Sequence, residues 1–340
     1  MYAPAVSYAD SSFFVELSAL KLDVLKLDTS FQDIVAYYNY SALGTEQPPS
    51  LNVSDSSFKG DSYLAKQLPP QSFFLSRGKL FNVNSIEEFK NVNKKDLLTE
   101  SALSLWNKIK DGSFTKDPSI LSSFILLSYA DLKKYKFYYW FAFPQLQSEW
   151  VQINTSPNVQ FNVRDRLFEQ QFYVISSDSD DSLLPLTSLF DQDKSFLKIL
   201  FIDTCSYENT TAYILRNFFS ALAYYNFHKV EVQVVKHSQP SLSFTTCLEN
   251  ANYNSTELTD PQYLPPVSGW EKTSRGKLGP KLANLGSLID PLQLADQAID
   301  LNLKLMKWRL VPQLNLQLVK DSRVLILGSG TLGSYTARCL

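Results

Sequence analysis

Residues 196–235 read FLKILFIDTCSYENTTAYILRNFFSALAYYNFHKVEVQVV and contain two apolar runs on either side of a helix-like segment. Phe196–Asp203 and Lys229–Val235 are rich in branched and aromatic side chains, which favour strands. Thr211–Tyr224 has apolar residues at helical spacing. A strand, a helix and a strand in this order suggest a parallel unit. Together with the elements around it, this unit predicts an α+β fold built on a mixed sheet.

Further helices and strands are expected on the amino-terminal side of this unit. Three segments have helical spacing: Ser11–Lys26, Ser85–Lys90 and Lys94–Lys110. The first has on one side Phe13, Phe14, Leu17, Leu20 and Val24. The third has on one stripe Leu97, Leu98, Ala102, Leu105, Trp106 and Ile109. Two segments are strand-like: Ser123–Tyr129 and the aromatic run Lys136–Phe143, joined through Asp131–Lys134 and ended by Pro144. We expect loops at Thr45–Gln71, with room for one short strand, and at His237–Ser268.

A second region begins near Gly269. Residues 269–289 are basic and punctuated by glycine, which is typical of a linker. Asp290 and Pro291 predict the start of a helix that runs over Leu292–Arg309 and ends before Pro312, with Ala295, Ala298, Ile299, Met306 and neighbouring leucines buried. A strand at Arg323–Leu327, a turn at Gly328–Gly333 and a final helix follow. We therefore expect a domain at 1–268, with room for two subdomains, a linker at 269–289 and the start of another domain at 290–340.

Composition and charge exclude several functional classes. The 340 residues carry 32 Lys and Arg against 34 Asp and Glu, and this net charge of -2 gives no general attraction to nucleic acid or anionic membranes. With 44% hydrophobic and 19% charged residues the chain is globular, and no apolar run approaches the ~18 residues of a membrane helix. The two histidines exclude a multi-histidine metal site, and the three cysteines form no C-x-x-C pair. Without a secretory signal, we expect a cytoplasmic protein with reduced thiols.

The glycine turn near the carboxyl end carries the clearest chemical motif. Gly328, Gly330 and Gly333 have G-x-G-x-x-G spacing between a branched apolar run and a helix-like segment. In nucleotide-binding folds, such glycines allow a tight turn, a close approach to phosphate and close packing of helix on strand. A phosphate-binding turn is therefore favoured over a purely structural one, which stays open. The complete unit needs ~30 residues and an acid ~20 residues further on. We therefore expect only a fragment of that domain. Its apolar residues Val324–Leu327 would have to be covered by other parts of the chain.

Several longer segments together resemble one family. DLKKYKFYYWFAFP (Asp131–Pro144), VSGWEK (Val267–Lys272) and LNLKLMKWRLVPQLNL (Leu301–Leu316), the last followed by RVLILGSGTLG, occur in one chain. Tyr2-Ala3-Pro4 is similar to a Phe-Ala-Pro motif, with tyrosine in place of phenylalanine. This combination resembles the autophagy-specific ubiquitin-like-modifier-activating enzymes. It spans almost the whole chain and is more specific than the glycine spacing.

The resemblance implies an N-terminal domain that recruits conjugating enzymes, followed by the first edge of an adenylation domain similar to bacterial sulfur-carrier activators. Members of the family are homodimers. They use ATP and magnesium to adenylate two ubiquitin-like proteins, capture each as a cysteine thioester and pass it to a conjugating enzyme. The resemblance places that cysteine downstream of Gly333, so no catalytic residue is expected here and Cys339 is interpreted as a small helix residue. The resemblance also implies a cytoplasmic protein recruited to the pre-autophagosomal structure, and a fragment that is monomeric, inactive alone and a poor binder of ATP.

The resemblance also suggests site residues, each with a structural alternative. Gly328, Gly330, Thr331, Leu332 and Gly333 would form part of an ATP site. Lys304 or Arg309 could reach ATP phosphates in the partner subunit, although a cation that interacts with helix-end carbonyls is favoured. For the conjugating enzyme the candidates are Tyr2, Ala3, Pro4, Lys136, Tyr138 and Trp140. The alternatives are an anchored amino terminus and a buried hairpin.

Other polar features favour structural interpretations. Lys272, Arg275, Lys277 and Lys281 could attract an acidic partner, but a solvated linker is favoured. Asp178–Asp181 lacks the glycine and glutamate of a calcium loop and reads as a solvated turn. His228 and His237 are expected at the surface or at strand ends. Two alternative functions remain: a self-contained nucleotide-binding enzyme that uses Gly328–Gly333, and a scaffold without either activity.

Overall fold

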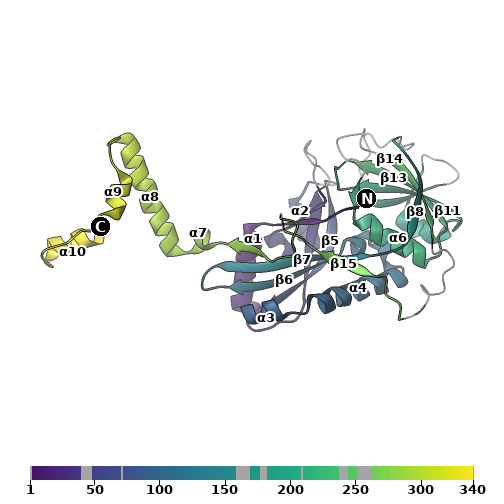
Figure 1. Ribbon diagram of the computed structural model, residues 1–340, viewed down its shortest axis with the longest axis horizontal. Helices are drawn as coiled ribbons and strands as arrows, with labels where there is room; N and C mark the ends of the chain where they lie inside the picture. Colours follow the sequence, from purple (N-terminus) through teal and green to yellow (C-terminus); the bar gives the residue numbers. More distant parts are fainter. Residues whose placement is uncertain are drawn as a thin grey trace. The chain divides into compact units, whose positions relative to one another are not determined.

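The computed structural model divides the chain into two compact units, Met1–Ala283 and Asn284–Leu340 (Figure 1). It describes residues 2–39, 48–69, 72–157, 169–176, 182–207, 210–236, 244–251, 260, 262–273 and 275–339. The larger unit contains two mixed sheets with helices, so the predicted α+β fold is confirmed.

The first sheet has eight strands, in the order β15-β7-β6-β5-β3-β4-β2 with β16 also on β7. The strands are β2 (Val6–Ala9), β3 (Gln32–Asn39), β4 (Ser50–Val53), β5 (Phe73–Val83), β6 (Phe124–Asp131), β7 (Lys136–Leu146), β15 (Val267–Trp270) and β16 (Lys281–Asn284). The pairs β2·β4 and β5·β6 are parallel and the hairpin β6·β7 is antiparallel. Part of the predicted linker 269–289 therefore lies on this sheet as β16 and the end of β15.

The two ends of the first sheet are held together by one buried carboxylate. Glu271, directly after β15, accepts hydrogen bonds from the Ser7 amide of β2 at 2.8 Å and from the Ser7 hydroxyl at 2.6 Å. Lys281 at the start of β16 donates to the same carboxylate at 2.6 Å. The sheet therefore curls, and its first and last strands meet through side chains.

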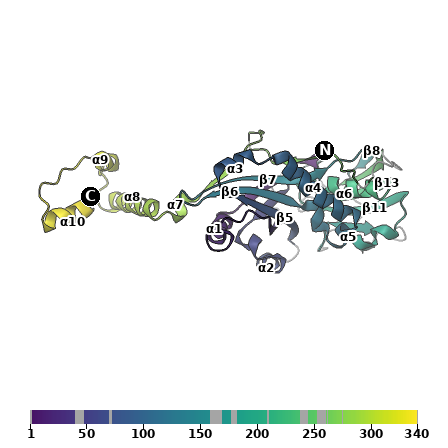
Figure 2. The ribbon, with the colours of Figure 1, turned by 90° about the horizontal axis from the view of Figure 1, so that it is seen from below.

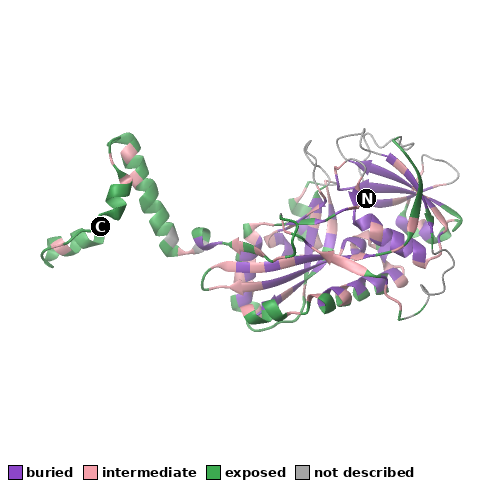
Figure 3. Cartoon of the chain, in the orientation of Figure 1, coloured by how far each residue is buried: buried purple, intermediate pink, exposed green. Residues whose placement is uncertain are grey.

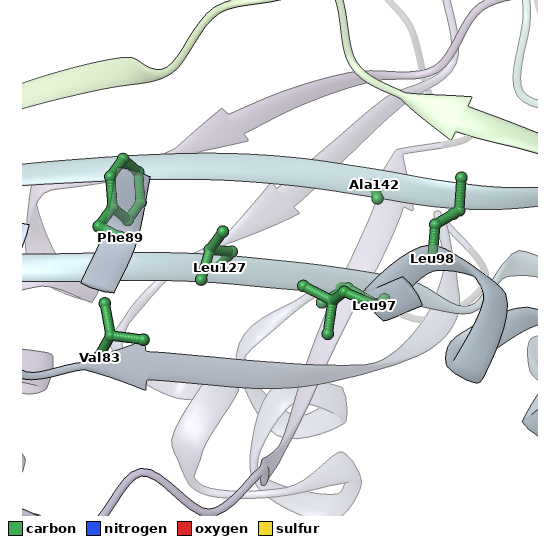
Figure 4. Packing of buried hydrophobic residues seen from close by; sticks show 7 residues of the cluster. Val83, Phe89, Leu97, Leu98, Leu127 and Ala142 are labelled. Carbon is green, nitrogen blue, oxygen red and sulfur yellow. The ribbon is translucent and has the colours of Figure 1, made fainter. Parts of the chain in front are cut away.

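Helices cover both faces of the first sheet (Figure 2). The sheet is flanked by α1 (Ser11–Leu20), which continues as the π-helix η1 (Lys21–Leu25), α2 (Asp61–Gln67), α3 (Ile86–Asn91) and α4 (Lys94–Lys110). On one face Phe14 of α1 packs on Phe137 and Tyr139 of β7, with ring centroids 5.1 Å apart in both pairs. On the other face Phe89 of α3 and Leu97 and Leu98 of α4 lie over Val83, Leu127 and Ala142 of the strands (Figure 4).

The predicted helices of this region are confirmed, with differences at their ends. All six predicted core positions of α4 are buried, and Asn93 caps the helix by accepting from the amides of Lys95 and Asp96. Phe13, Phe14 and Leu17 of α1 are buried, but Val24 is exposed because the chain has passed into η1, where helical spacing no longer holds. The predicted loop 45–71 contains β4, the 3₁₀ turn η2 (Asp55–Phe58) and α2.

Pro144 does not end the second hairpin strand, contrary to the prediction. β7 continues through it to Leu146, because Pro144 lies at the place where β15 is irregular. The β15 register shifts between Ser268 and Trp270, and Gly269 has φ +151°. A proline is tolerated there because a bulged partner does not require its missing N–H.

The second sheet contains the unit on which the fold prediction rests. Its order is β10-β9-β11-β13-β14-β8. The strands are β8 (Trp150–Ser156), β9 (Phe172–Ile175), β10 (Leu183–Pro185), β11 (Phe196–Asp203), β13 (Lys229–Lys236) and β14 (Phe244–Asn250). β11 and β13 are parallel and in register over their whole length, with α6 (Ile214–Tyr224) between them in sequence, so the strand–helix–strand unit is confirmed. The predicted loop His237–Ser268 is wrong in part, because β14 pairs with both β13 and β8.

Buried side chains join the two sheets. Asn217 of α6 is fully buried; it donates to the carbonyls of Leu121 and Pro144 at 2.8 and 2.9 Å and accepts from the Leu146 amide at 2.8 Å. Leu121 belongs to the 3₁₀ turn η3 (Pro118–Ser122), which follows α5 (Ser113–Lys116). Phe74 of β5 packs into the cluster formed by β9, β11 and β13. A 3₁₀ turn, η4 (Leu186–Asp191), links β10 to β11.

The smaller unit is helical and leaves most of its apolar side chains exposed (Figure 3). It contains α7 (Gly286–Ile289), α8 (Pro291–Arg309), α9 (Leu316–Asp321) and α10 (Thr331–Cys339). Asp290 caps α8 and Pro291 is its first residue, as predicted. The predicted burial along α8 is wrong: Ala295 and Ala298 are exposed, as are Ile299 at 57% and Met306 at 51%. Within the smaller unit the short helices α7 and α9 pack on this 19-residue helix and leave these side chains exposed.

Arg323–Leu327 is not a strand, contrary to the prediction. Within the described part of the chain nothing pairs with it, and an isolated strand has no partner for its backbone groups. Leu325 and Leu327 are 81% and 89% exposed, so this apolar run is uncovered in this structure.

Candidate functional site

A groove of about 320 Å³ lies beside α4 on the first sheet. Its lining combines three elements of the sheet layer with one side of the helix. β3 provides Asp33–Val35, β5 provides Arg77–Lys79, β6 provides Phe124 and Ile125, and α4 provides Leu97, Glu100, Ser101, Ser104, Leu105 and Lys108. The groove therefore has an apolar floor and a polar rim, the usual construction of a binding site.

The groove exists because α4 does not cover the whole sheet face. α4 packs on β7, β15 and β6, whereas Asp33 of β3 and Arg77 and Lys79 of β5 are exposed beside it. On the opposite face of the sheet, Gly78 leaves room for an aromatic ring: a Cβ atom there would lie 2.4 Å from the Phe124 ring, which packs near Phe141. The absence of a side chain at Gly78 lets this ring lie directly on the neighbouring strand.

Charged groups line the rim of the groove and are held by neighbouring side chains. Arg77 is held by Asp61 at 2.6 Å and by Asp117 at 2.8 Å. Burial of Asp117 raises its pKa, but hydrogen bonds from Ser119 and Arg77 and the Arg77 charge outweigh this effect, so the pKa lies below its usual value. The Lys79 ammonium lies 5.8 Å from the Phe31 ring.

The α4 side of the rim is a polar row along one side of the helix. Glu100, Ser104 and Lys108 follow each other at four-residue spacing, which places them one above the other on a helix. The groove therefore offers a negative group at one end of this row and a positive group at the other.

The predicted amino-terminal motif is packed against a different part of the molecule. Tyr2 and Ala3 form β1 (Tyr2–Ala3), which pairs in parallel with β12 (Thr211–Ala212). Ala3 is buried and Pro4 is exposed. The Arg216 guanidinium lies 5.6 Å from the centre of the Tyr2 ring, and burial raises the pKa of Tyr2 to about 12 despite this positive charge. This geometry is that of an anchored terminus.

A fully buried ion pair fixes the loop that leads to β12, the strand with which this terminus pairs. Lys236 at the end of β13 donates to Asp203 at 2.8 Å and to the carbonyls of Cys205 and Thr210 at 2.6 and 2.7 Å. The other Asp203 oxygen accepts from the amides of Cys205 and Ala212. An ammonium has three donors and all three are used, so the pair holds the loop in place and has no donor left for a ligand.

The predicted hairpin residues lie on β7 under α3 and α4. Lys136, Tyr138 and Trp140 share one face and are half-buried, whereas Tyr139 is buried on the opposite face. Trp140 packs edge-on against Trp270 at 5.7 Å, and the Lys94 ammonium lies 5.3 Å from its ring. These contacts place Tyr138 and Trp140 partly in the core, outside the lining of the groove.

The glycine turn has backbone geometry that requires glycine at two of its three positions. Gly328 has φ +117°, which side chains rarely allow, and a Cβ at Gly333 would lie 2.0 Å from the Gly328 carbonyl oxygen. A Cβ at Gly330 would meet open space, so the backbone there is accessible. Thr331 and Leu332 begin α10, and Arg309 is exposed at the end of α8.

The other candidates have structural surroundings or lie outside the described residues. Burial raises the pKa of the Cys205 and Cys247 thiols, which weakens them as nucleophiles, and Cys339 is exposed on α10. His228 lies before β13 and contacts Glu249 at 2.9 Å. Of the basic cluster, Lys281 is bound to Glu271. His237 and Asp178–Asp181 lie outside the described residues.

Two classes of site are not found in the described part of the chain. No group of three or more His, Cys, Asp or Glu residues there is arranged to hold a metal ion. Among the same residues no helix is long and apolar enough to cross a membrane.

The sequence did not predict the groove. Its residues come from four segments between Phe31 and Ile125, and their proximity depends on the sheet order. The available signals were the polar row Glu100, Ser104 and Lys108 and the Arg-Gly-Lys interruption of an apolar strand at 77–79. Both are common features of exposed surfaces.

Comparisons with known proteins agree on one family. The family model described as "Ubiquitin-like modifier-activating enzyme ATG7 N-terminus" matches residues 1–289. The ATG7 of Pichia angusta is 46% identical over 339 residues, 100% of this chain and 51% of that protein. The ATG7 of Saccharomyces cerevisiae strain S288c is 38% identical over 351 residues, 100% of this chain and 53% of that protein. The chain thus spans about half the length of the curated relatives that it matches.

Solved structures show a similar fold. The crystal structure of Kluyveromyces marxianus Atg7NTD matches with a TM-score of 0.64 and 26% identity, over 84% of this chain and 99% of that one. The structure of the same organism's Atg7NTD–Atg10 complex matches with a TM-score of 0.62 and 25% identity, over 84% and 97% of the two chains.

Proposed function

Because the chain belongs to the family of ubiquitin-like modifier-activating enzyme ATG7 N-terminal regions, we propose that its larger unit recruits a conjugating enzyme. A similar Atg7 N-terminal domain has been solved in complex with Atg10. Recruitment requires a surface and no chemistry, which agrees with the buried thiols and the fully used Asp203–Lys236 pair. A tethered enzyme would present its cysteine at a raised effective concentration to a thioester formed elsewhere in the full-length protein.

The single observation that carries this proposal is the open groove beside α4. In two-layer α/β packing, helices lie side by side on a sheet face, and α4 leaves the β3–β5 part of that face open. An amphipathic helix from the conjugating enzyme would fit there, with its apolar side on Val35, Leu105 and Ile125.

Charge would set the direction of that helix. Lys108 and Lys79 suit an acidic side chain, whereas Glu100 suits a basic one. Such rim charges guide association and orientation more than they add affinity.

The sequence-based candidates have supporting roles in this proposal. Tyr2 and Ala3 would anchor the amino terminus, with Pro4 exposed beside them. Lys136, Tyr138 and Trp140 would support α3 and α4, the second of which borders the groove. Residues 1–268 would form the recruiting domain together with the strand residues of 269–289 that join its sheet, the rest of 269–289 a connection, and residues 290–340 the first edge of an adenylation domain.

The glycine turn would supply part of an ATP site in the full-length protein. The open space at Gly330 and the close approach at Gly333 fit a backbone that contacts phosphate. Gly328, Gly330, Thr331, Leu332 and Gly333 would bind phosphate, with Arg309 as a further candidate. ATP with magnesium would activate the ubiquitin-like protein, and the adenylation domain would form the homodimer. The setting would be autophagy, in the cytoplasm and at the pre-autophagosomal structure.

Calorimetric titration with the family's Atg10-type conjugating enzyme tests the recruiting role. Ser104→Trp fills the groove from an exposed position and should weaken binding about tenfold or more. Leu103→Trp adds the same ring at the neighbouring exposed position, outside the groove lining, and should bind as the unchanged chain does. Equal affinities for both variants would place the recruiting surface elsewhere.

The competing function, a self-contained nucleotide-binding enzyme, makes a different prediction. It requires saturable binding of ATP by this chain at micromolar concentration, which calorimetry with ATP and magnesium measures directly. The exposed Leu325 and Leu327 argue against it, because a phosphate-binding turn needs a covered strand behind it. Tight ATP binding by the isolated chain would favour the enzyme over the recruiting module.

A further inference from the structure

The ends of the two sheets in the larger unit differ in how they are protected. A free sheet edge can pair with another chain, and proteins usually block it with charge, proline, shortness or cover. The two ends of the first sheet are tied together through Ser7 and Glu271. In the second sheet, the edge strand β10 has only three residues and ends in Pro185. β8 at the opposite edge has seven residues, WVQINTS, without charge, proline or glycine.

β8 also lacks cover from the rest of the described chain. It pairs with β14 from Trp150↔Asn250 to Ser156↔Thr245, and no other described strand pairs with it. Every residue of β8 after Trp150 is exposed (Figure 3), with Val151 at 59% and Ile153 at 48%. Trp150 is anchored by its ring against Phe219 of α6. The strand therefore presents an accessible backbone edge together with β-branched side chains.

We propose that β8 is a self-association surface, on which the β8 strands of two copies of this chain pair antiparallel and join their second sheets. A two-fold axis places each strand against an identical one, so a residue near the axis meets its own copy and a charge there would meet a like charge. β8 carries none. Its exposed Val151, Ile153 and Thr155 are β-branched, a class of side chain that favours strand pairing. This proposal does not depend on the recruiting role of the groove.

The geometry of β8 sets the strength of this association. The register with β14 shifts between Cys247 and Leu248, which leaves Ile153 without a direct partner. Such a bulge increases the local twist, so only a short stretch of β8 can pair with a second copy. A single short strand pair buries less surface than stable dimers need. The dimer should therefore be weak and form only at high concentration.

Sedimentation of the full chain over about a hundredfold range of concentration tests the proposal. The unchanged chain should shift from monomer towards dimer as concentration rises. Val151→Lys with Ile153→Lys should reduce the association constant about tenfold or more, since it places charge on both strands of the pair. Leu22→Lys with Val24→Lys changes two other exposed apolar residues, at 62% and 67%, and should leave association unchanged. Thermal melts should be similar for all three chains, because all four positions are exposed.

A cysteine crosslink provides an independent readout. In a Cys339→Ser background, which removes the exposed native thiol, Ile153→Cys should form a disulfide-linked dimer under mild oxidation much faster than Leu103→Cys on α4. The proposal is overturned if the chain stays monomeric at all concentrations, or if both lysine pairs weaken association equally. It is also overturned if Ile153→Cys crosslinks no faster than the α4 control. Loss of conjugating-enzyme binding in the β8 variant without self-association would instead assign this edge to a strand of the conjugating enzyme.

Discussion

Helices α4 and α8 each carry one tryptophan and a row of apolar side chains, but the row of α4 is buried and that of α8 is exposed. Trp106 of α4 is fully buried and its indole N–H donates to the Tyr263 carbonyl at 2.9 Å. Trp308 of α8 is 74% exposed. An apolar stripe therefore shows which side of a helix can be buried, whereas the neighbouring elements determine whether it is buried.

The same contrast holds for the ion pairs of the two units. Lys236 and Asp203 in the larger unit are 0% exposed and 2.8 Å apart. Lys320 and Asp300 in the smaller unit are 66% and 50% exposed and 3.4 Å apart. Burial removes water as the alternative partner of each charge, so the two pairs should respond very differently to the loss of a partner.

The largest expected effect comes from breaking the buried pair. Lys236→Met leaves Asp203 as an uncompensated buried charge and should destabilise the larger unit by about 3–5 kcal/mol. Lys320→Met, the matched change at the exposed pair, should cost less than about 1 kcal/mol. Urea unfolding followed by circular dichroism measures both. Similar losses of unfolding free energy in the two variants would mean that the two ion pairs do not differ in burial as described.

The two tryptophans allow the packing of α4 and α8 to be compared directly. Trp106→Ala removes a fully buried ring and should destabilise the chain by about 3–5 kcal/mol, because it creates a cavity and removes the hydrogen bond from the indole N–H to the Tyr263 carbonyl. Trp308→Ala should change stability by only about 0.5 kcal/mol. Thermal denaturation of both variants provides the test. A large loss for Trp308→Ala would contradict its exposure.

The sequence predicted the elements whose apolar pattern is regular. The stripe of α4, the aromatic alternation of β7 and the branched runs β11 and β13 each bury what their periodicity indicates. β5 was missed because Arg77, Gly78 and Lys79 interrupt its pattern, at the place where one face of the strand lies open. β14 was missed because FTTCLEN is polar enough to read as loop.

The candidate site could be predicted only in part. The glycine turn is local in sequence, so its need for glycine at Gly328 and Gly333 follows from their spacing and agrees with the geometry. The groove depends on strand order: Asp33 and Lys79 face each other across β3 and β5, and α4 arrives from a different segment. A pairing of residues so far apart in sequence cannot be derived from local periodicity.

Glycine substitutions extend the comparison to the backbone of each unit. Gly269 in β15 has φ +151°, and a Cβ there would lie 2.0 Å from the Phe143 carbonyl oxygen. Gly269→Ala should therefore destabilise the larger unit by about 1–3 kcal/mol. A Cβ at Gly330 would meet nothing within 4 Å, so Gly330→Ala should change stability by about 0.5 kcal/mol or less. Urea midpoints of the two variants measure the difference, and equal midpoints would contradict the close contact at Gly269.

The smallest expected effect appears only at alkaline pH. Tyr139 of β7 is buried against Phe14, and burial, aided by the nearby negative charge of Glu271, raises its pKa to about 12. In the unfolded chain a tyrosine ionises near pH 10. Between these values the unfolded chain releases a proton that the folded chain keeps, so stability should fall as pH rises from about 10 to 12. Tyr139→Phe removes this titration and should make the fall shallower. The effect is partial, because burial raises the pKa of Tyr2 and Tyr225 to about 12 as well.

Urea midpoints measured at intervals from pH 9 to about 11.5 test this expectation. Tyr335→Phe, which removes a hydroxyl from a side chain that is 62% exposed on α10, is the matched control in the smaller unit. An unchanged pH slope for Tyr139→Phe would mean that Tyr139 ionises equally readily in the folded and unfolded chains. The burial of β7 under α1 would then be less complete than the contrast between the two units requires.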